Sequence, residues 1–183
     1  TFGSTVLKQD YSVGDYLILL YKKVLIDEFG ESNATLIINE TKKLADYHTA
    51  HGLRTTMLYI DTWVDAAVAS GAVNTSNRAN FSEWLDNNVI NKVLRDIGAR
   101  YMLIVGGDNI IPFGRISNAF IHNVDNRDNE PGYPGYVSAG YFLSDFTYAD
   151  VDDDWQPDTN DAKVGRLVGN TDIITKVLNR SMQ

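Results

Sequence analysis

The residues whose types and spacing best suit chemistry form an acidic stretch that begins at Asp150 and ends at Asp161. Carboxylates occupy positions 1, 3, 5, 9 and 12 of this stretch, and the backbone carbonyl of Gln156 falls at position 7. That spacing matches the ligands of an EF-hand calcium loop. A true EF-hand is nevertheless not expected, because Trp155 stands where the loop needs a glycine and Asp161 replaces a longer glutamate.

Calcium remains the cation that this stretch favours. Like charges at this density cost stability unless solvent or a cation neutralises them, and a Ca²⁺ ion takes roughly six to eight oxygen ligands. We therefore predict a structural Ca²⁺ held by Asp152, Asp154 and Asp158 together with a backbone carbonyl. A solvated acidic loop without an ion is the alternative that the composition leaves open.

The acidic stretch lies within the most anionic part of the chain. The whole chain has a formal net charge of −8, whereas residues 125–161 hold ten acidic residues against Arg127 alone and carry −9. Residues 1–124 contribute −2 and residues 162–183 contribute +3. Phosphate binding needs a basic stripe, and the sequence has none, so nucleic acid is not expected as a partner.

A second candidate site is the turn from Gly106 to Pro112, which follows an apolar run. Glycines at the carboxyl end of a buried parallel strand let the backbone approach a ligand, and open α/β sheets bind ligands at this edge. Asp108 in this turn is either a ligand or an ordinary turn residue. Neither G-x-G-x-x-G nor G-x-x-x-x-G-K-[ST] is present, which argues against a nucleotide-binding, flavodoxin-like domain.

Conventional catalytic groups are scarce. The sequence contains no cysteine, which excludes a cysteine nucleophile, thiolate metal sites and disulfides within these residues. His48 and His51 lie near an expected helix end, where histidine usually caps the helix or faces solvent. His122 lies close to Asp125 and could act as an oriented base, but no Gly-x-Ser-x-Gly elbow accompanies it.

Apolar periodicity predicts the elements that position these groups. Continuous apolar runs at residues 16–21 and 101–105 predict buried strands, and residues 53–60 predict another strand between them. Amphipathic spacing predicts helices over residues 34–51 and 82–97. This alternation implies right-handed crossovers and a mainly parallel sheet with helices on both faces, which is an α/β fold.

The second half of the chain is less regular. Residues 106–140 are rich in Gly, Pro, Asn and Asp, so we expect irregular structure, with residues 117–140 as a long insertion. Aromatic and β-prone residues over 141–151 predict one or two strands, and residues 164–168 predict another. A last helix is predicted over residues 172–180.

Polar residues before the first and last predicted helices are candidate helix caps. Ser32 or Asn33 is expected to cap the first long helix, and Asn170 or Thr171 the last one. The length suits one domain over residues 1–183. The longest strongly apolar run is far shorter than the roughly 20 residues that a membrane span requires, so no membrane span is expected.

Five segments, in this order, resemble the gingipain-like cysteine peptidase family. Residues 16–20 read YLILL, and residues 44–57 read LADYHTAHGLRTTM, which is similar to a family helix and strand that contain ADW and GL. Residues 101–112, YMLIVGGDNIIP, resemble its YVLLVGD strand and IP turn. Residues 144–158, SDFTYADVDDDWQPD, match its SD and D-x-D-W-x-P-D segment, and residues 164–166 read VGR. The fixed order of these segments is more specific than any one of them.

The resemblance implies a caspase-like, three-layer fold of which this chain is the first, non-catalytic subdomain. In the family the catalytic His follows a Gly-His-Gly strand end and the Cys follows another strand, both in the second subdomain. Neither motif is present here. We therefore expect that subdomain C-terminal to this chain, a peptide or protein as the substrate of the parent, and an extracellular or cell-surface location.

The resemblance also implies a calcium site built from the turn after the third strand and the acidic stretch. By motif position it implies these ligands: Asp154, Asp158 and the carbonyls of Gln156 and Val151. The family aspartate that follows VG aligns with Gly107, so Asp108 is displaced by one residue as a ligand.

Two interpretations stay open at this point. In one, the chain is the calcium-stabilised, non-catalytic part of a secreted cysteine endopeptidase. In the other, it is a standalone calcium-binding or scaffolding module of the same fold without peptidase activity.

Overall fold

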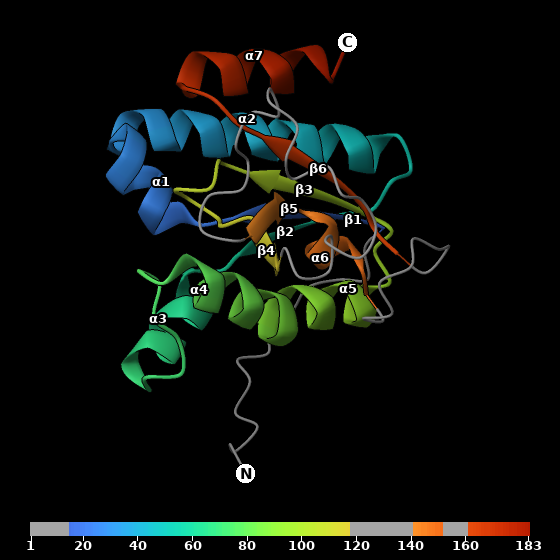
Figure 1. Cartoon of the computed structure of the whole chain (residues 1–183). Helices are drawn as coiled ribbons and strands as arrows, with labels where there is room; N and C mark the ends of the chain where they lie inside the picture. The colour runs from blue at the N-terminus through green and yellow to red at the C-terminus, as the bar shows by residue number, and fades with distance from the viewer. Residues whose placement is uncertain (1–14, 118–140, 152–160) are drawn as a thin grey trace, which may run out of the picture.

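The structure, a computed structural model, describes residues 15–117, 141–151 and 161–183. Its centre is a sheet with the strand order β2-β1-β3-β6 (Figure 1), in which every neighbouring pair is parallel. These strands are β1 (Tyr16–Leu20), β2 (Thr55–Tyr59), β3 (Tyr101–Val105) and β6 (Lys163–Leu167). The predicted parallel sheet is therefore confirmed.

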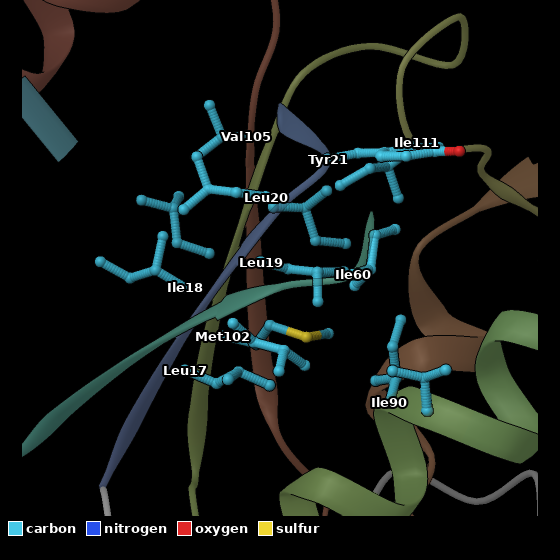
Figure 2. Close-up of a cluster of buried hydrophobic side chains, with 14 of the residues drawn as sticks. Leu17, Ile18, Leu19, Leu20, Tyr21, Ile60, Ile90, Met102, Val105 and Ile111 are labelled. Carbon is cyan, nitrogen blue, oxygen red and sulfur yellow. The ribbon is translucent and has the colours of Figure 1, made fainter. Parts of the chain in front are cut away.

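Strand β1 lies in the middle of the sheet and is the centre of the core. Its residues Leu17 to Leu20 have no exposed surface. Figure 2 shows them among apolar side chains that include Met102 and Val105 of β3, Ile60 after the neighbouring strand, and Ile90 from the helical layer. A strand covered on both faces reads as a continuous apolar run, whereas β2 at the sheet edge alternates between buried and half-buried residues.

Helices cover both faces of the sheet (Figure 1). On one face α2 (Glu31–Ala50) packs against α7 (Thr171–Arg180). On the other, α4 (Arg78–Leu85), the π-helical turn η1 (Asp86–Ile90) and α5 (Asn91–Ile97) run on continuously. This is the predicted three-layer α/β fold, and it is consistent with a caspase-like architecture. Among the described helices, none is long and apolar enough to cross a membrane.

Two short helices, α1 (Lys22–Phe29) and α3 (Asp61–Ala69), are missing from the sequence-based prediction. Helix α1 has no capping side chain in its own N-terminal residues. The amides of Lys22 and Lys23 donate instead to the carboxylate of Asp61, at 3.1 and 2.7 Å. The cap therefore comes from the start of α3, and a local sequence pattern cannot reveal it.

The predicted starts of the two long helices also need correction. The first begins at Glu31, so the predicted caps Ser32 and Asn33 both lie inside it. The second begins at Arg78, because the side chain of Asn77 caps it there. Both helices are thus longer than predicted at their N-terminal ends.

The second half forms a small antiparallel pair, β4 (Gly114–Ser117) and β5 (Tyr141–Ser144), followed by the short helix α6 (Phe146–Ala149). The prediction of irregular structure is therefore wrong for β4. The strand predicted within residues 141–151 is confirmed for β5 and wrong for α6. The remainder of the predicted insertion, residues 118–140, lies outside the described residues.

Candidate functional site

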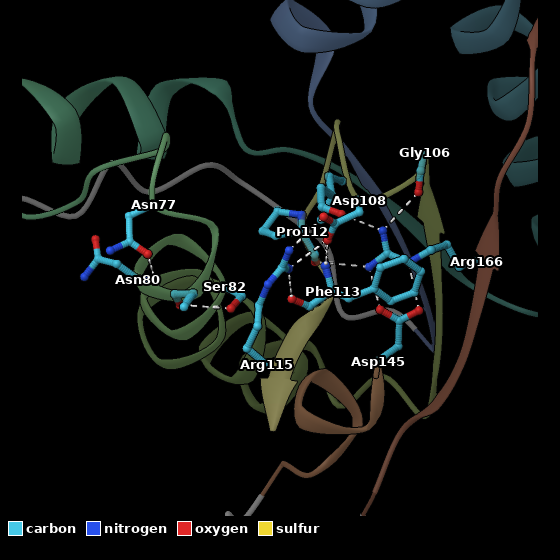
Figure 3. Close-up of polar contacts among 12 residues, drawn as sticks. Asn77, Asn80, Ser82, Gly106, Asp108, Pro112, Phe113, Arg115, Asp145 and Arg166 are labelled. Atoms are coloured by element: carbon cyan, nitrogen blue, oxygen red, sulfur yellow. Dashed lines mark hydrogen bonds and ion pairs between the residues drawn. The ribbon is translucent and has the colours of Figure 1, made fainter. Parts of the chain in front are cut away.

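The turn after β3, at the carboxyl-end edge of the sheet, is organised by Arg166 of β6. The side chain of Arg166 is only 5% exposed, and its guanidinium forms a two-pronged ion pair with Asp145, with 2.8 Å between Nε and Oδ2. It lies 4.1 Å from the centre of the Phe113 ring. It also donates to three carbonyls of the turn (Figure 3), at 3.0, 2.6 and 3.2 Å: Gly106, Ile111 and Pro112. One planar group with five donors thereby joins β6, the turn and the residue preceding α6.

Asp108 lies in the same turn and pairs with Arg115 of β4. Two distances of 2.7 Å join the terminal nitrogens of Arg115 to the two carboxylate oxygens of Asp108. The amide of Phe113 donates to Oδ1 of Asp108 at 2.8 Å, and Arg115 also donates to the carbonyl of Phe113. In the described structure Asp108 thus acts as a turn residue that ties β4 to the end of β3.

Electrostatics stabilise this arrangement. Burial acts to raise the pKa of the Asp108 carboxyl group, but the hydrogen bonds and charge of Arg115, with the Phe113 amide and the charge of Arg78, hold that pKa below its ordinary value. Burial lowers the pKa of Arg78, whose Nη2 is buried and has no hydrogen-bond partner in the described structure. The negative charge of Asp108 therefore stabilises the charged form of a second guanidinium, that of Arg78, besides that of Arg115.

Two glycines allow the chain segments to approach this closely. Gly106 has a φ of 120°, and a Cβ there would lie 2.8 Å from the side chain of Ile110. A Cβ on Gly114 would lie 2.0 Å from Oγ1 of Thr147 and 2.9 Å from the carbonyl oxygen of Ser144. The turn after β3 and the start of β4 therefore have no space for a side chain at these positions.

The acidic stretch is anchored at its base. The amide of Ala162 donates to the carbonyl of Ala149 at 3.0 Å, which brings the two ends of the stretch together. Tyr148 is fully buried, and its hydroxyl donates to the carbonyl of Pro112 at 2.8 Å. The base of the acidic stretch and the turn after β3 are therefore parts of one connected region.

Two of the predicted calcium ligands, Asp108 and Val151, lie within the described residues. The carbonyl of Val151 accepts a hydrogen bond from Arg95 at 2.8 Å and keeps a second lone pair for another partner. Within the described part of the chain, no three metal-ligating side chains lie close together. The other four predicted ligands lie outside the described residues: Asp152, Asp154, Gln156 and Asp158.

The comparison with known families bears directly on this region. A family model described as peptidase family C25 matches residues 10–183, a span that includes the whole sheet, the turn after β3 and the acidic stretch. The chain belongs to peptidase family C25. This is the gingipain family, so the resemblance seen in the sequence is confirmed. No curated protein and no solved structure matches the chain significantly.

Membership of peptidase family C25 does not place a catalytic group in the described site. The sequence has no cysteine, and the described turn offers guanidinium groups paired with carboxylates rather than a nucleophile and a base. His48 and His51 lie at the end of α2, where Nδ1 of His51 is 2.8 Å from the carbonyl oxygen of Tyr47. His122 lies outside the described residues. The described side chains therefore shape this edge of the C25 fold.

Three important residues were absent from the sequence-based candidates: Arg115, Asp145 and Arg166. A signal did exist for two of them, because Asp145 belongs to the SD motif and Arg166 ends the VGR motif of the family resemblance. Their pairing spans 21 residues along the chain. Periodicity reports only local neighbours, so it could not have joined them.

Proposed function

We propose that this chain is the non-catalytic subdomain of a gingipain-like cysteine endopeptidase, and that the catalytic His and Cys belong to a second subdomain C-terminal to it. The observation that carries the proposal is the C25 family match over residues 10–183 in a sequence without cysteine. A cysteine peptidase needs a thiolate nucleophile activated by a base. In this proposal the substrate is a protein or peptide, and the parent acts outside the cell or at its surface, as the family resemblance implies.

The open edge of the sheet supports this proposal. Strand β6 pairs with β3 on one side, and no described strand pairs with its other side. An unpaired strand edge presents amides and carbonyls to which a further strand can bind. In the segment that follows β6, Val168 and two residues one turn apart on α7, Ile173 and Val177, expose large apolar side chains. Such side chains suit the packing of an added layer.

The same proposal includes a structural Ca²⁺ at the acidic stretch. Its first support is the oxygen-rich spacing of residues 150–161. Its second is charge density: carboxylates occupy positions 1, 3, 5, 9 and 12 of these residues. Like charges at this density cost stability unless solvent or a cation neutralises them, and a hard divalent ion neutralises several carboxylates at once.

The proposed ligands are those that the sequence suggests: Asp152, Asp154, Asp158 and the carbonyls of Gln156 and Val151. All are oxygen donors, as Ca²⁺ prefers. Asp108 fits this set less well, because Arg115 and the amide of Phe113 already engage its carboxylate oxygens. The ion would neutralise charge and fix the acidic stretch, and it would take no part in peptide hydrolysis.

The deciding experiment compares this chain with the full-length protein that contains it. The encoding sequence beyond Gln183 is expected to contain a Gly-His-Gly strand end and, further on, a Cys at a strand end. The full-length protein should hydrolyse peptides, and a thiol-blocking reagent or Cys→Ala at that position should abolish the activity. This chain alone should hydrolyse none.

A different outcome would favour the second interpretation. If both motifs are absent and the full-length protein hydrolyses no peptide, the C25 fold serves here as a standalone calcium-binding or scaffolding module. The folded core of the described chain is compatible with that role, because its sheet is buried between helices on both faces without any second subdomain.

A further inference from the structure

A cavity of about 370 Å³ lies between the sheet and the helices α2 and α7. It belongs to no part of the turn around Arg166, and the proposed peptidase function makes no use of it. Its volume falls within the range of about 300–1,000 Å³ that is typical of small-molecule sites. Most of its wall consists of leucine side chains from α2, α7, β3, β6 and the segment before β2: Leu44, Leu53, Leu103, Leu167 and Leu178.

The wall of the cavity is uncharged. Besides the leucines it contains Tyr16, His48, Tyr101 and Ser181. Burial, with the charge of nearby His51, lowers the pKa of His48, so its ring is neutral at neutral pH. A charged guest would meet no counter-charge in this wall. The cavity therefore disfavours free amino acids and peptide termini, and it favours uncharged molecules.

Aromatic rings form one side of the wall. The centre of the Tyr16 ring lies 4.7 Å from that of His48, with the two planes tilted by 59°. It lies 6.2 Å from the centre of the Tyr101 ring, and these two planes are within 19° of parallel. Ring faces and edges in this arrangement attract a further aromatic ring by offset or edge contacts.

Among the residues of the wall, His48 has a buried side-chain nitrogen that makes no hydrogen bond in the described structure. Its Nδ1 is buried and has no hydrogen-bond partner in the described structure. Buried polar atoms are nearly always paired, so each exception calls for an explanation, such as a water molecule or a ligand. The hydroxyl of Ser181, by contrast, already donates to the carbonyl of Val177 at 2.9 Å.

We infer that this cavity binds a small, uncharged aromatic molecule with one hydroxyl group, of which phenol is the simplest case. The ring lies among the leucines and beside Tyr16, and the hydroxyl bonds to Nδ1 of His48. A hydroxyl both donates and accepts, so it suits either tautomer of a neutral imidazole. The site is separate from the turn around Arg166, because Arg166 and Leu167 are successive residues of β6 and point to opposite faces.

The experiment uses phenol and toluene as matched probes, because the two share a shape and differ in the hydroxyl. Each is titrated into the 183-residue chain while the methyl signals of the wall leucines are followed by NMR. Phenol should shift these signals saturably. In His48→Phe, which keeps a flat ring and removes the unpaired nitrogen, the ratio of phenol affinity to toluene affinity should fall about fivefold.

Two tryptophan variants of α7 test the location independently. Ser181→Trp fills the rim of the cavity and should weaken phenol binding more than about tenfold, which is the loss expected when several apolar contacts are displaced. Asn179→Trp places the same side chain at an exposed position outside the wall and should change phenol binding less than about twofold. Both positions are exposed, so both variants should fold.

Four results would overturn the inference. The first is the absence of saturable shifts at the wall leucines. The second is an equal response of Ser181→Trp and Asn179→Trp, which would mean adventitious binding elsewhere. The third is an unchanged phenol-to-toluene ratio in His48→Phe. Shifts of the same methyl signals on dilution without any probe would instead assign the cavity to contact with a second copy of the chain, and would also overturn it.

Discussion

Two regions of this molecule bury polar groups in opposite ways. In the brace, which consists of Asp108, Arg115, Asp145 and Arg166, each guanidinium has a two-pronged carboxylate partner and donates to backbone carbonyls as well. In the cavity beneath α2 and α7, Nδ1 of His48 is buried and unpaired in the described structure. Every guanidinium and carboxylate of the brace is paired, whereas the cavity leaves one polar atom unpaired.

The paired groups of the brace suit stabilisation of the fold, whereas the unpaired atom of the cavity suits recognition of a ligand. A fully paired buried network fixes the positions of the segments that it joins, because breaking any one bond leaves the remaining groups without partners. An unpaired buried atom costs stability but can bond to an incoming ligand. The brace includes Arg166 of β6, the strand beside which the proposed second subdomain would join, so rigidity is useful there. The cavity lies on the other face of the sheet, between the sheet and the helices α2 and α7.

Breaking the brace at Arg166 should have the largest effect. Arg166→Met leaves Asp145 without its charged partner and three carbonyls without a donor, so we expect a loss of about 3–5 kcal/mol in the free energy of unfolding. Lys176→Met breaks the exposed pair of Lys176 with Asp172 and should cost less than about 0.5 kcal/mol. Urea unfolding followed by circular dichroism measures both.

The conservative variant sharpens this comparison. Arg166→Lys keeps the charge but loses the planar fork, so its stability should lie between that of the wild type and that of Arg166→Met. Where these variants are folded, phenol binding in the cavity should persist, because the two regions occupy opposite faces of β6. A cost for Arg166→Met no greater than that for Lys176→Met would show that the brace does not stabilise the fold.

Calcium removal should give the next largest effect. If the acidic stretch binds Ca²⁺, an ion concentration about 100-fold above Kd stabilises the fold by about 2.7 kcal/mol relative to excess chelator. Asp158→Asn should lose most of this difference. Asp172→Asn, on the exposed face of α7, should retain it. The measurement is Tm by circular dichroism in both conditions, and equal Tm values for the wild type would contradict the calcium proposal.

Much of the fold could be predicted from the sequence because its signals are local. The core strands β1 and β3 are continuous apolar runs, since both of their faces are covered. The last helix begins at Thr171, one residue before its predicted start, and of the two predicted caps it is Asn170 whose side chain accepts from the amide of Ile173 at 3.0 Å. Each of these features depends on residues within one or two turns of one another.

The brace and helix α1 could not be predicted for the converse reason. Asp61 caps a helix 39 residues away, and Arg166 bonds to carbonyls that precede it by 54 to 60 residues. Only the folded sheet brings such partners together. The role of Asp108 could not be predicted either. Its sequence context allowed a ligand or a turn residue, and the side chain that engages it, Arg115, was not among the candidates.

The smallest expected effect is that of Asp108→Asn on the free energy of unfolding, and its dependence on pH tests the pairing with Arg115. The pKa of Asp108 is lower in the folded chain than in the unfolded chain, where it is about 3.9. Its charge therefore stabilises the fold above that pH, and this contribution is lost as the pH falls through the folded-state pKa. Since the side chain is 35% exposed and solvent screens the pair, we expect Asp108→Asn to cost only about 1 kcal/mol at pH 7.

The difference between wild type and Asp108→Asn should stay constant from pH 7 to about pH 4 and shrink below it. Urea unfolding at several pH values in the presence of chelator provides the measurement, with Asp172→Asn as the exposed control. A difference that grows on acidification would mean that the pKa of Asp108 is raised, which is incompatible with its pairing to Arg115. If the difference at pH 7 instead depends on Ca²⁺, Asp108 exchanges Arg115 for the ion, and the brace and the proposed calcium site share this carboxylate.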